Sequence, residues 1–423
     1  MRKPILALAG VMLGSLFVTS ASALPLFARQ TGFACSQCHF QHFPLLNAYG
    51  RSFKAGGFTM MGAQPKVEGE ALSIPDRLNM GVLTTLGVEN VSGPENATYK
   101  NSANTPGGGG ELSLFFGGRV SDNVGFLAEM GTAGTAGMTA AKLPMFYEVA
   151  EGTRAGLVFV TTNGQGAAHS FETLNTGAAA VHRMAPTPGQ NANNAHTRAN
   201  SAAQYLGTNT AAQGASFVVN NKRYFVNAGK YAIPAAMGSN TQGGAMRMTY
   251  MRAAAMFDVA DFDSAAGVQA FRGDDGVEGG MTGTEATIID GQMQGAFDKY
   301  PLGLYVSYGT APVVNNATAV GNKFNAGGAV TSSSLNIAVE LGVVPGVATV
   351  MAAVRMAKNG GIDANGADAT DNAVMVGMTY DLAMNVEASL SYTRQSGTKW
   401  DAPAGGVEPA GKAVTTLILE ALF

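Results

Sequence analysis

The strongest constraint on the fold is a period of two in the pattern of apolar and polar residues, which begins near residue 77 and continues to the end of the chain. Successive side chains of a β-strand point to opposite faces, so this alternation predicts strands with one apolar and one polar face. The segments are about ten residues long, as in transmembrane barrels, and turn-forming residues separate them. One segment carries the apolar residues Leu335, Ile337, Val339, Leu341 and Val343.

Short and long connections alternate between these predicted strands. Short turns are predicted near residues 121–123, 151–153, 220–221, 260–262, 298–300, 344–346 and 381–383. Long connections are predicted near residues 91–110, 132–140, 163–213, 232–243, 273–283, 312–331, 358–371 and 396–411. Transmembrane barrels carry short turns on one rim and long loops on the other. A soluble β-sandwich would explain the alternation of residues, but neither the two kinds of connection nor the aromatic residue at the C-terminus.

The sequence therefore predicts an all-β fold, a transmembrane antiparallel β-barrel of about 16 strands over residues 77–423. Charged residues make up 13% of the chain, against about 25% in ordinary soluble domains. No stretch after residue 23 approaches the roughly 18 consecutive apolar residues of a membrane-spanning helix. Without residues 1–23, 24 Lys and Arg stand against 29 Asp and Glu, which leaves no basic surface for nucleic acid.

The first 23 residues have the pattern of a secretory signal peptide. Arg2 and Lys3 precede an almost wholly apolar run over residues 5–19, and small residues follow it. The run is too short for a good membrane span. We therefore expect export from the cytoplasm and a mature chain that begins at Leu24.

A Cys-x-x-Cys-His motif follows at Cys35, Cys38 and His39. This spacing is that of covalent attachment sites for c-type haem, in which the thiols bind the porphyrin and the histidine ligates the iron. A redox dithiol or a plain disulfide has no need of the adjacent histidine. A structural zinc site needs a second pair of ligands, whereas the chain has only these 2 cysteines. The motif predicts one haem c.

Residues 24–76 form a small unit around this motif, with one or two short helices expected between Cys35 and Lys54 and an interruption near Pro44. Roughly 50 residues cannot bury enough apolar surface to be stable alone. We therefore expect the unit to lean on the barrel, and to plug a lumen that would otherwise leak.

The stretch FARQTGFACSQCHFQHFPLLNAYGRSFKAGGFTMMG resembles the N-terminal signature of the fused outer-membrane cytochrome–porins of iron-oxidising bacteria. The resemblance is close over residues 25–62 and architectural beyond. It implies a single haem on Cys35 and Cys38 with His39 as proximal ligand, ahead of a barrel of about 16 strands. It also implies oxidation of extracellular Fe(II) and a periplasmic c-type cytochrome as electron acceptor. Because outer-membrane barrels have short periplasmic turns and long extracellular loops, we expect outer-membrane lipid around the barrel, extracellular long loops and both termini in the periplasm.

The second axial ligand of the haem is less defined. Met60 and Met61 follow His39 at a distance that allows the chain to fold over the iron, and a thioether ligand would raise the reduction potential. Both also suit core packing. Contacts to the haem propionates, or packing, are expected for His42, Arg29, Arg51 and Lys54.

Capture of Fe(II) would require oxygen ligands near the mouth of the barrel. One predicted long loop carries Asp274, Asp275 and Glu278, and another carries Asp363, Asp368 and Asp371. Carboxylates on an outer rim would concentrate a divalent cation, although solvated loop tips are an equally good interpretation. The longest loop carries His169, His182 and His196, which could bind iron, fold inward or be ordinary loop residues.

Two other classes of function fit the same pattern. An electron-exporting conduit has the same parts with the opposite direction of flow, and its reduction potential distinguishes it. A passive diffusion porin with a structural haem plug differs in its ion conductance.

Overall fold

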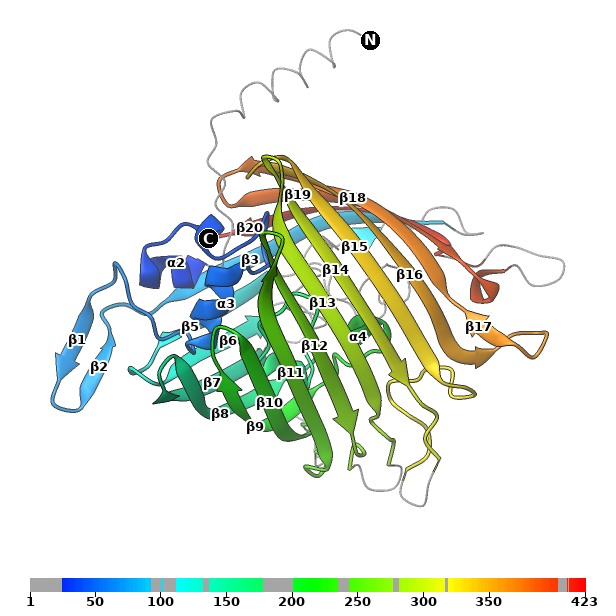
Figure 1. Cartoon of the computed structure of the whole chain (residues 1–423), viewed down its shortest axis with the longest axis horizontal. Coiled ribbons are helices and arrows are strands. Elements are labelled where there is room, and N and C mark those ends of the chain that lie inside the picture. Colours follow the sequence, from blue (N-terminus) through cyan, green and yellow to red (C-terminus); the bar gives the residue numbers. More distant parts are fainter. Residues whose placement is uncertain are drawn as a thin grey trace, which may run out of the picture.

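The computed structural model describes residues 25–92, 100–101, 112–131, 137–177, 201–234, 243–276, 281–315, 319–401, 409 and 411–423. A closed β-barrel dominates these residues, and a small N-terminal unit lies at one of its rims (Figure 1). Within the described residues, no helix has the length and apolar character needed to cross a membrane.

Sixteen long strands form the described wall of the barrel, in sequence order and with each neighbour antiparallel. They are β3 (Met80–Val91), β5 (Leu112–Arg119), β6 (Gly125–Gly131), β7 (Gly137–Ala150), β8 (Thr153–Thr162), β9 (Ala212–Asn220), β10 (Tyr224–Ala232), β11 (Met248–Val259), β12 (Phe262–Arg272), β13 (Ala286–Phe297), β14 (Tyr300–Ala311), β15 (Ser332–Val344), β16 (Ala348–Ile362), β18 (Asn372–Ala383), β19 (Val386–Ser396) and β20 (Ala413–Leu422). Two short strands, β4 (Lys100–Asn101) and β17 (Asp368–Thr370), pair beside β3 and β16. The barrel closes where β20 pairs with β3, with Leu422 opposite Leu83.

All seven predicted short turns join neighbouring strands at the same rim, which we call the short-turn rim. The turn between β11 and β12 shows why these connections can be short. Its residues Ala260 and Asp261 have φ of 47° and 67°. Two consecutive residues of positive φ are the geometry that joins antiparallel strands with the correct twist. The prediction of an antiparallel barrel of about 16 strands with alternating short and long connections is confirmed.

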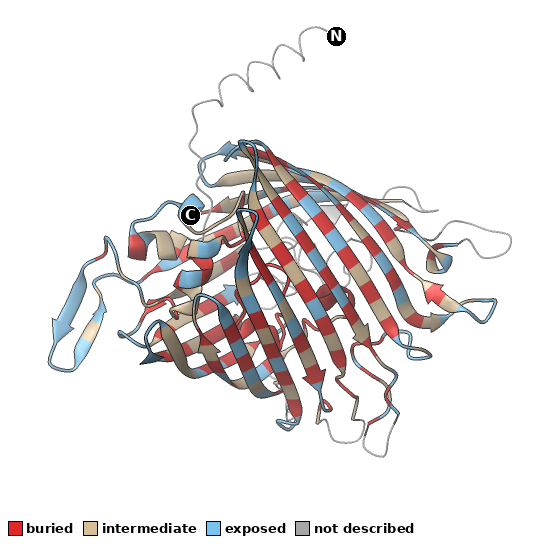
Figure 2. Ribbon diagram, in the orientation of Figure 1, coloured by how far each residue is buried: buried red, intermediate tan, exposed pale blue. Residues whose placement is uncertain are grey.

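The wall has an apolar outer face and a largely polar inner face. On β15 the outward residues Ile337 and Val339 are exposed, whereas the inward residues Asn336 and Glu340 are buried. Figure 2 shows this alternation of buried and exposed residues along many strands. The polar inner side chains are buried because other parts of the chain fill the barrel.

The N-terminal unit contains α2 (Pro25–Thr31), the 3-10 turn η1 (Cys35–Gln37), α3 (Ala48–Ala55) and the hairpin of β1 (Lys66–Gly69) and β2 (Leu72–Pro75). Helix α3 begins after Asn47, whose side-chain oxygen accepts the amide of Gly50 at 2.9 Å. Helix α2 packs against β3 and β5 at the short-turn rim, and the hairpin projects outward (Figure 1). The short helices and the break near Pro44 agree with the sequence prediction.

The described parts of the connection between β8 and β9, residues 163–177 and 201–211, fold into the barrel, which is one of the alternatives left open for this loop. These parts include η2 (Ala167–His169) and α4 (Ala202–Tyr205), which pack against inward aromatic residues such as Tyr250 and Phe271. The physical reason is that the connection and the inner wall of the barrel carry matching apolar surfaces here. Small residues of the connection allow close approach to an inner wall that is apolar at this level, and burial of both is favourable.

Candidate functional site

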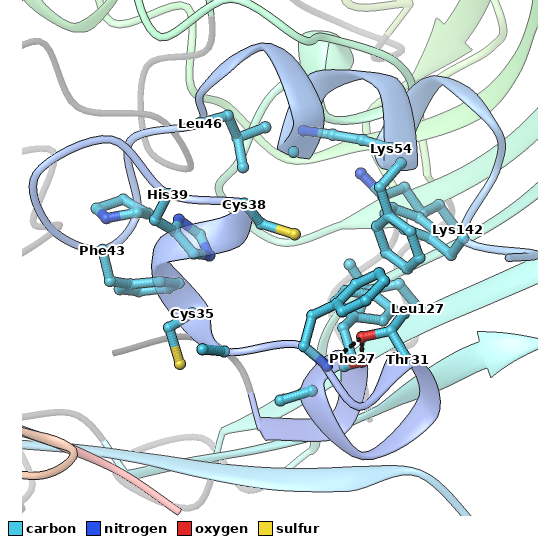
Figure 3. Close-up of a pocket in the computed structure, with 17 residues that line it drawn as sticks. Phe27, Thr31, Cys35, Cys38, His39, Phe43, Leu46, Lys54, Leu127 and Lys142 are labelled. Atoms are coloured by element: carbon cyan, nitrogen blue, oxygen red, sulfur yellow. Dashed lines mark hydrogen bonds between the residues drawn. The ribbon is translucent and has the colours of Figure 1, made fainter. Parts of the chain in front are cut away.

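The N-terminal unit and the inner wall of the barrel enclose a pocket with about 810 Å³ of space free of protein atoms, including solvent at its open side. The unit supplies most of the lining, and β6 and β7 supply Leu127 and Lys142 (Figure 3). Most of the exposed surface in the pocket is apolar. The full lining comprises Phe27, Ala28, Thr31, Phe33, Ala34, Cys35, Cys38, His39, Phe43, Pro44, Leu46, Gly50, Phe53, Lys54, Phe58, Leu127 and Lys142.

Both cysteines of the motif line this pocket as free thiols. The η1 turn positions them, because the carbonyl of Cys35 accepts the amides of Cys38 at 3.0 Å and His39 at 2.9 Å. Burial raises the pKa of Cys35 to about 11 and also raises the pKa of Cys38. A redox dithiol needs a thiol of lowered pKa, so this environment disfavours that interpretation of the motif.

His39 is oriented by a backbone carbonyl. Its Nδ1 lies 3.1 Å from the oxygen of Leu45, and because a carbonyl can only accept, Nδ1 is the donor. The lone pair is then on Nε2, the arrangement that protein surroundings impose on metal-binding histidines. Desolvation lowers the pKa of His39 to about 4, against the opposing effect of the Leu45 carbonyl. The ring is therefore neutral, as a metal ligand must be.

A close helix contact holds the motif rigid. A Cβ atom on Gly50 would lie 2.1 Å from the carbonyl oxygen of Cys38, so only glycine allows α3 to approach this closely. The side chain of Asn47 adds hydrogen bonds to the carbonyls of Ser36 and Gln37, at 3.3 and 3.0 Å. Helix α3 thus supports the turn that carries the thiols.

Aromatic rings form much of the remaining wall. The rings of Phe27 and Phe58 stack at 4.9 Å, and Phe53 meets Phe27 edge-on at 5.1 Å. The ring of Phe43 lies 5.3 Å from that of His39. A pocket of this kind suits a large, flat apolar group beside the thiols.

Two lysines complete the pocket, one from each part of the chain. Burial lowers the pKa of Lys54 on α3 to about 8, and the charge of Glu172 opposes that shift. The Nζ of Lys142 on β7 donates to the carbonyl of His169 at 3.0 Å and lies 5.6 Å from the centroid of the Phe58 ring. Figure 3 shows both lysines on the side of the pocket away from Cys35, His39 and Phe43.

These residues fit a c-type haem by four independent criteria. Two thiols and a neutral imidazole with a fixed tautomer border one pocket, flat aromatic walls enclose it, and two lysine amino groups lie at its side. The free thiols match the groups of a haem that react covalently, and the imidazole matches its iron. The apolar walls match its macrocycle, and the lysines match its carboxylates.

Neither methionine proposed from the sequence as an axial ligand lines the pocket. Met60 is 37% exposed, and its sulfur accepts a hydrogen bond from the hydroxyl of Tyr49 at 3.4 Å. Met61 is half-buried beside it in the chain. Axial ligation by either methionine stays a prediction.

Three other residues, proposed as haem-propionate or packing contacts, attach the N-terminal unit to the barrel. The buried His42 places Nε2 3.0 Å from Glu340 on β15, and Glu340 raises the pKa of His42 to about 10 despite the opposing effect of burial. Arg51 pairs with Asp263 on β12, and Arg29 donates to the carbonyl of Met80 at 2.6 Å. Of the four basic residues in that prediction, Lys54 is the one that lines the pocket.

Two of the three acidic residues in the first group proposed for Fe(II) capture are engaged in salt bridges. Asp274 and Asp275 are both buried, and they pair with Arg247 at 2.9 Å and with Lys323 at 3.7 Å. Glu278 lies outside the described residues. These salt bridges engage both carboxylates, and capture of Fe(II) by this group stays a prediction.

The second acidic group, Asp363, Asp368 and Asp371, likewise makes separate contacts with other residues. Asp371 is buried and accepts from Arg355 at 2.5 Å, Lys399 at 2.7 Å and the indole of Trp400 at 2.8 Å. Asp368 pairs with Lys358, and Asp363 accepts amides of its own turn. Across the described ranges, no three His, Cys, Asp or Glu residues gather as a metal site.

The described part of the β8–β9 connection before the gap, residues 163–177, which we call the inward loop, contacts the N-terminal unit. The side chain of Asn175 accepts the amide of Leu46 at 2.8 Å and donates to its carbonyl at 3.0 Å. His169 is buried in the same loop, whereas His182 and His196 lie outside the described residues. Sequence reasoning missed Asn175, Leu127 and Lys142, and the one available signal was a lysine at an inward position of a strand.

Comparison with known proteins supplies no family. No protein-family model matches the chain, and no curated protein matches it. Among solved structures, an anion-selective porin from Comamonas acidovorans has 12% identity and a TM-score of 0.49, with 82% of this chain and 99% of that chain covered. Salmonella typhi OmpF in complex with daunomycin has 11% identity and a TM-score of 0.49, with 85% and 100% covered. Nothing about the activity or ligands of this chain follows from similarity at this level.

Proposed function

We propose that the chain is an outer-membrane barrel protein that holds one covalent haem c in the pocket of its N-terminal unit and transfers electrons from extracellular Fe(II) to a periplasmic c-type cytochrome. One observation carries the proposal. Cys35, Cys38 and His39 border an apolar pocket at the short-turn rim, with Nδ1 of His39 committed to the Leu45 carbonyl. The resemblance of residues 25–62 supplies the electron donor and the acceptor.

The outer face of the barrel supports insertion in a membrane. Large apolar side chains are exposed along strand after strand, for example Val374, Val376 and Met378 on β18 and Leu417 and Leu419 on β20. A soluble protein rarely exposes so large a contiguous apolar surface. Antiparallel barrels with lipid-facing apolar residues and short turns on one rim are typical of bacterial outer membranes, with those turns in the periplasm.

The segments that fill the barrel favour a role in electron transfer rather than in diffusion of solutes through the lumen. The N-terminal unit reaches Glu340 from the short-turn rim, and the inward loop meets the unit at Leu46 and Asn175. Arg252 of β11 holds that loop through Glu172 and also binds Asp290, with all three side chains buried. A bound haem would supply one-electron chemistry at the edge of this packed interior.

The proposed direction is from the outside inward. Each Fe(II) ion loses one electron and leaves as Fe(III) outside the cell, and one oxidised periplasmic cytochrome gains that electron. Insoluble ferric product then stays outside. The opposite direction, an electron-exporting conduit, uses the same parts.

Anaerobic addition of Fe(II) to the purified, oxidised protein tests the proposal. We expect the haem absorption bands to change to those of the reduced form within seconds, and a periplasmic cytochrome to reverse the change. His39→Ala is the matched variant that should not respond. A potential well below that of the Fe(III)/Fe(II) couple, with oxidised bands after Fe(II) addition, would overturn iron oxidation. Ion conductance in a planar bilayer, with the N-terminal unit in place, would instead support a passive porin.

A further inference from the structure

The two pocket lysines come from parts of the chain that are far apart in the sequence. Lys54 lies on α3 of the N-terminal unit, and Lys142 lies on β7 of the barrel wall. Both line the same pocket, whose other lining residues are mostly apolar or aromatic. The barrel therefore contributes a charged group to a site that the motif alone would assign to the N-terminal unit.

Burying ammonium groups in such surroundings is costly without anions. Lys142 is 3% exposed, and its hydrogen bond goes to a neutral acceptor, the carbonyl of His169. Glu172 acts on Lys54 through its charge, but this carboxylate also accepts from Arg252 at 2.9 and 3.4 Å. The pocket thus brings two lysine amino groups to one side of an apolar cavity, where the carboxylates of a ligand would stabilise their charged forms.

We infer that Lys54 and Lys142 together bind the two carboxylates of the tetrapyrrole held in this pocket, so that the barrel wall completes the haem site. The inference rests on the proposed function, because it requires a haem. It goes further in assigning a ligand-binding role to a strand of the barrel. A folded N-terminal unit separated from the barrel would lack half of this anion site.

The lysines also bear on electron affinity. A positive charge close to an electron acceptor stabilises the reduced form. Because the protein tunes a haem through its surroundings, loss of either lysine should make reduction less favourable. This effect does not require a change in the covalent attachment at Cys35 and Cys38.

Potentiometric titration of the full-length, haem-loaded protein in detergent tests the inference. Variants Lys54→Gln and Lys142→Gln remove one charge each, Lys142→Arg keeps it, and Lys358→Gln removes an exposed lysine that pairs with Asp368. Intact mass and heat-modifiable gel mobility first establish one haem per chain and a closed barrel for each variant. Resonance Raman bands of the haem carboxylates provide a second readout.

We expect K54Q and K142Q to retain one haem and to lower the equilibrium constant for reduction at least tenfold, about 59 mV for one electron. Their carboxylate bands should shift, whereas K142R and K358Q should resemble the wild type. Unchanged potentials and unchanged bands in both glutamine variants would overturn the inference and leave the proposed function intact. A wild-type chain without haem would overturn both. Should K142Q not form a closed barrel, K54Q and K142R decide the question.

Discussion

The salt bridge between His42 and Glu340 is expected to hold the N-terminal unit in the barrel. Both ring nitrogens of His42 are engaged, with Nδ1 2.7 Å from the carbonyl of Phe43 and Nε2 3.0 Å from the Glu340 carboxylate. The two side chains are 3% and 1% exposed, so solvent screens the pair little. Glu340→Gln keeps the size of the side chain and removes its charge.

The expected loss of stability in Glu340→Gln follows from the burial of the ion pair. Removing one partner of a buried ion pair costs about 3–5 kcal/mol, because the other charge is left without compensation. The rise in the pKa of His42 from 6.5 to about 10 points to the same range, roughly 5 kcal/mol at 1.36 kcal/mol for each pKa unit. At about 1.4 kcal/mol for each factor of ten, opening of the unit should become roughly 10² to 4 × 10³ times more frequent.

Hydrogen exchange with mass spectrometry measures this opening. Amides of residues 39–56 should exchange faster in Glu340→Gln by that factor, while amides of the barrel wall keep their rates. The matched control is Asp368→Asn, which breaks the exposed pair with Lys358 and should change little, since such pairs contribute about 0–1 kcal/mol. Equal exchange of residues 39–56 in wild type and Glu340→Gln would refute the reasoning.

Four further predictions follow from the site and the barrel. Because the pKa of His42 is raised, its contribution to the stability of the docked N-terminal unit is complete below pH 6.5 and is lost as pH rises through about 10. Over this pH range, the rate of amide exchange in α3 should therefore show an extra increase in wild type and not in Glu340→Gln. Cys35→Ala and Cys38→Ala should each weaken haem attachment, as seen by intact mass. Gly50→Ala forces a clash with Cys38 and should reduce haem content severalfold, whereas Ser52→Ala on the same helix should not. Epitope tags at residues 381–383 should become accessible on cells only after the outer membrane is opened.

The barrel could be predicted from the sequence because its signals are local. Alternation within about ten residues defines each strand, and turn residues such as Asp261 and Gly346 define its ends. The haem motif is local as well, since η1 brings Cys35, Cys38 and His39 together within five residues. Neither prediction needed knowledge of which distant segments meet.

The remaining features depend on contacts between distant segments. The pairing of Asp274 with Arg247 joins residues 27 positions apart, and the contact between Leu46 and Asn175 spans 129. The inward course of the described β8–β9 connection depends on aromatic residues of other strands, such as Tyr250 on β11. No periodicity within the loop itself carries that information. Lys142 could be noticed as a lysine at an inward position of a strand, but its place in the pocket appears only when the fold brings β7 and Lys54 of α3 together.

The anchoring contacts also determine how the two parts of the chain can be inherited or engineered. His42 and Arg51 find their carboxylates on β15 and β12, strands that lie far beyond the boundary near residue 76. Transplanting residues 24–76 onto a foreign barrel would enclose an imidazolium and a guanidinium without matching carboxylates, a loss of several kcal/mol for each. Functional chimeras therefore need Asp263 and Glu340 to be transferred along with the unit, and the two segments are expected to diverge together as one module.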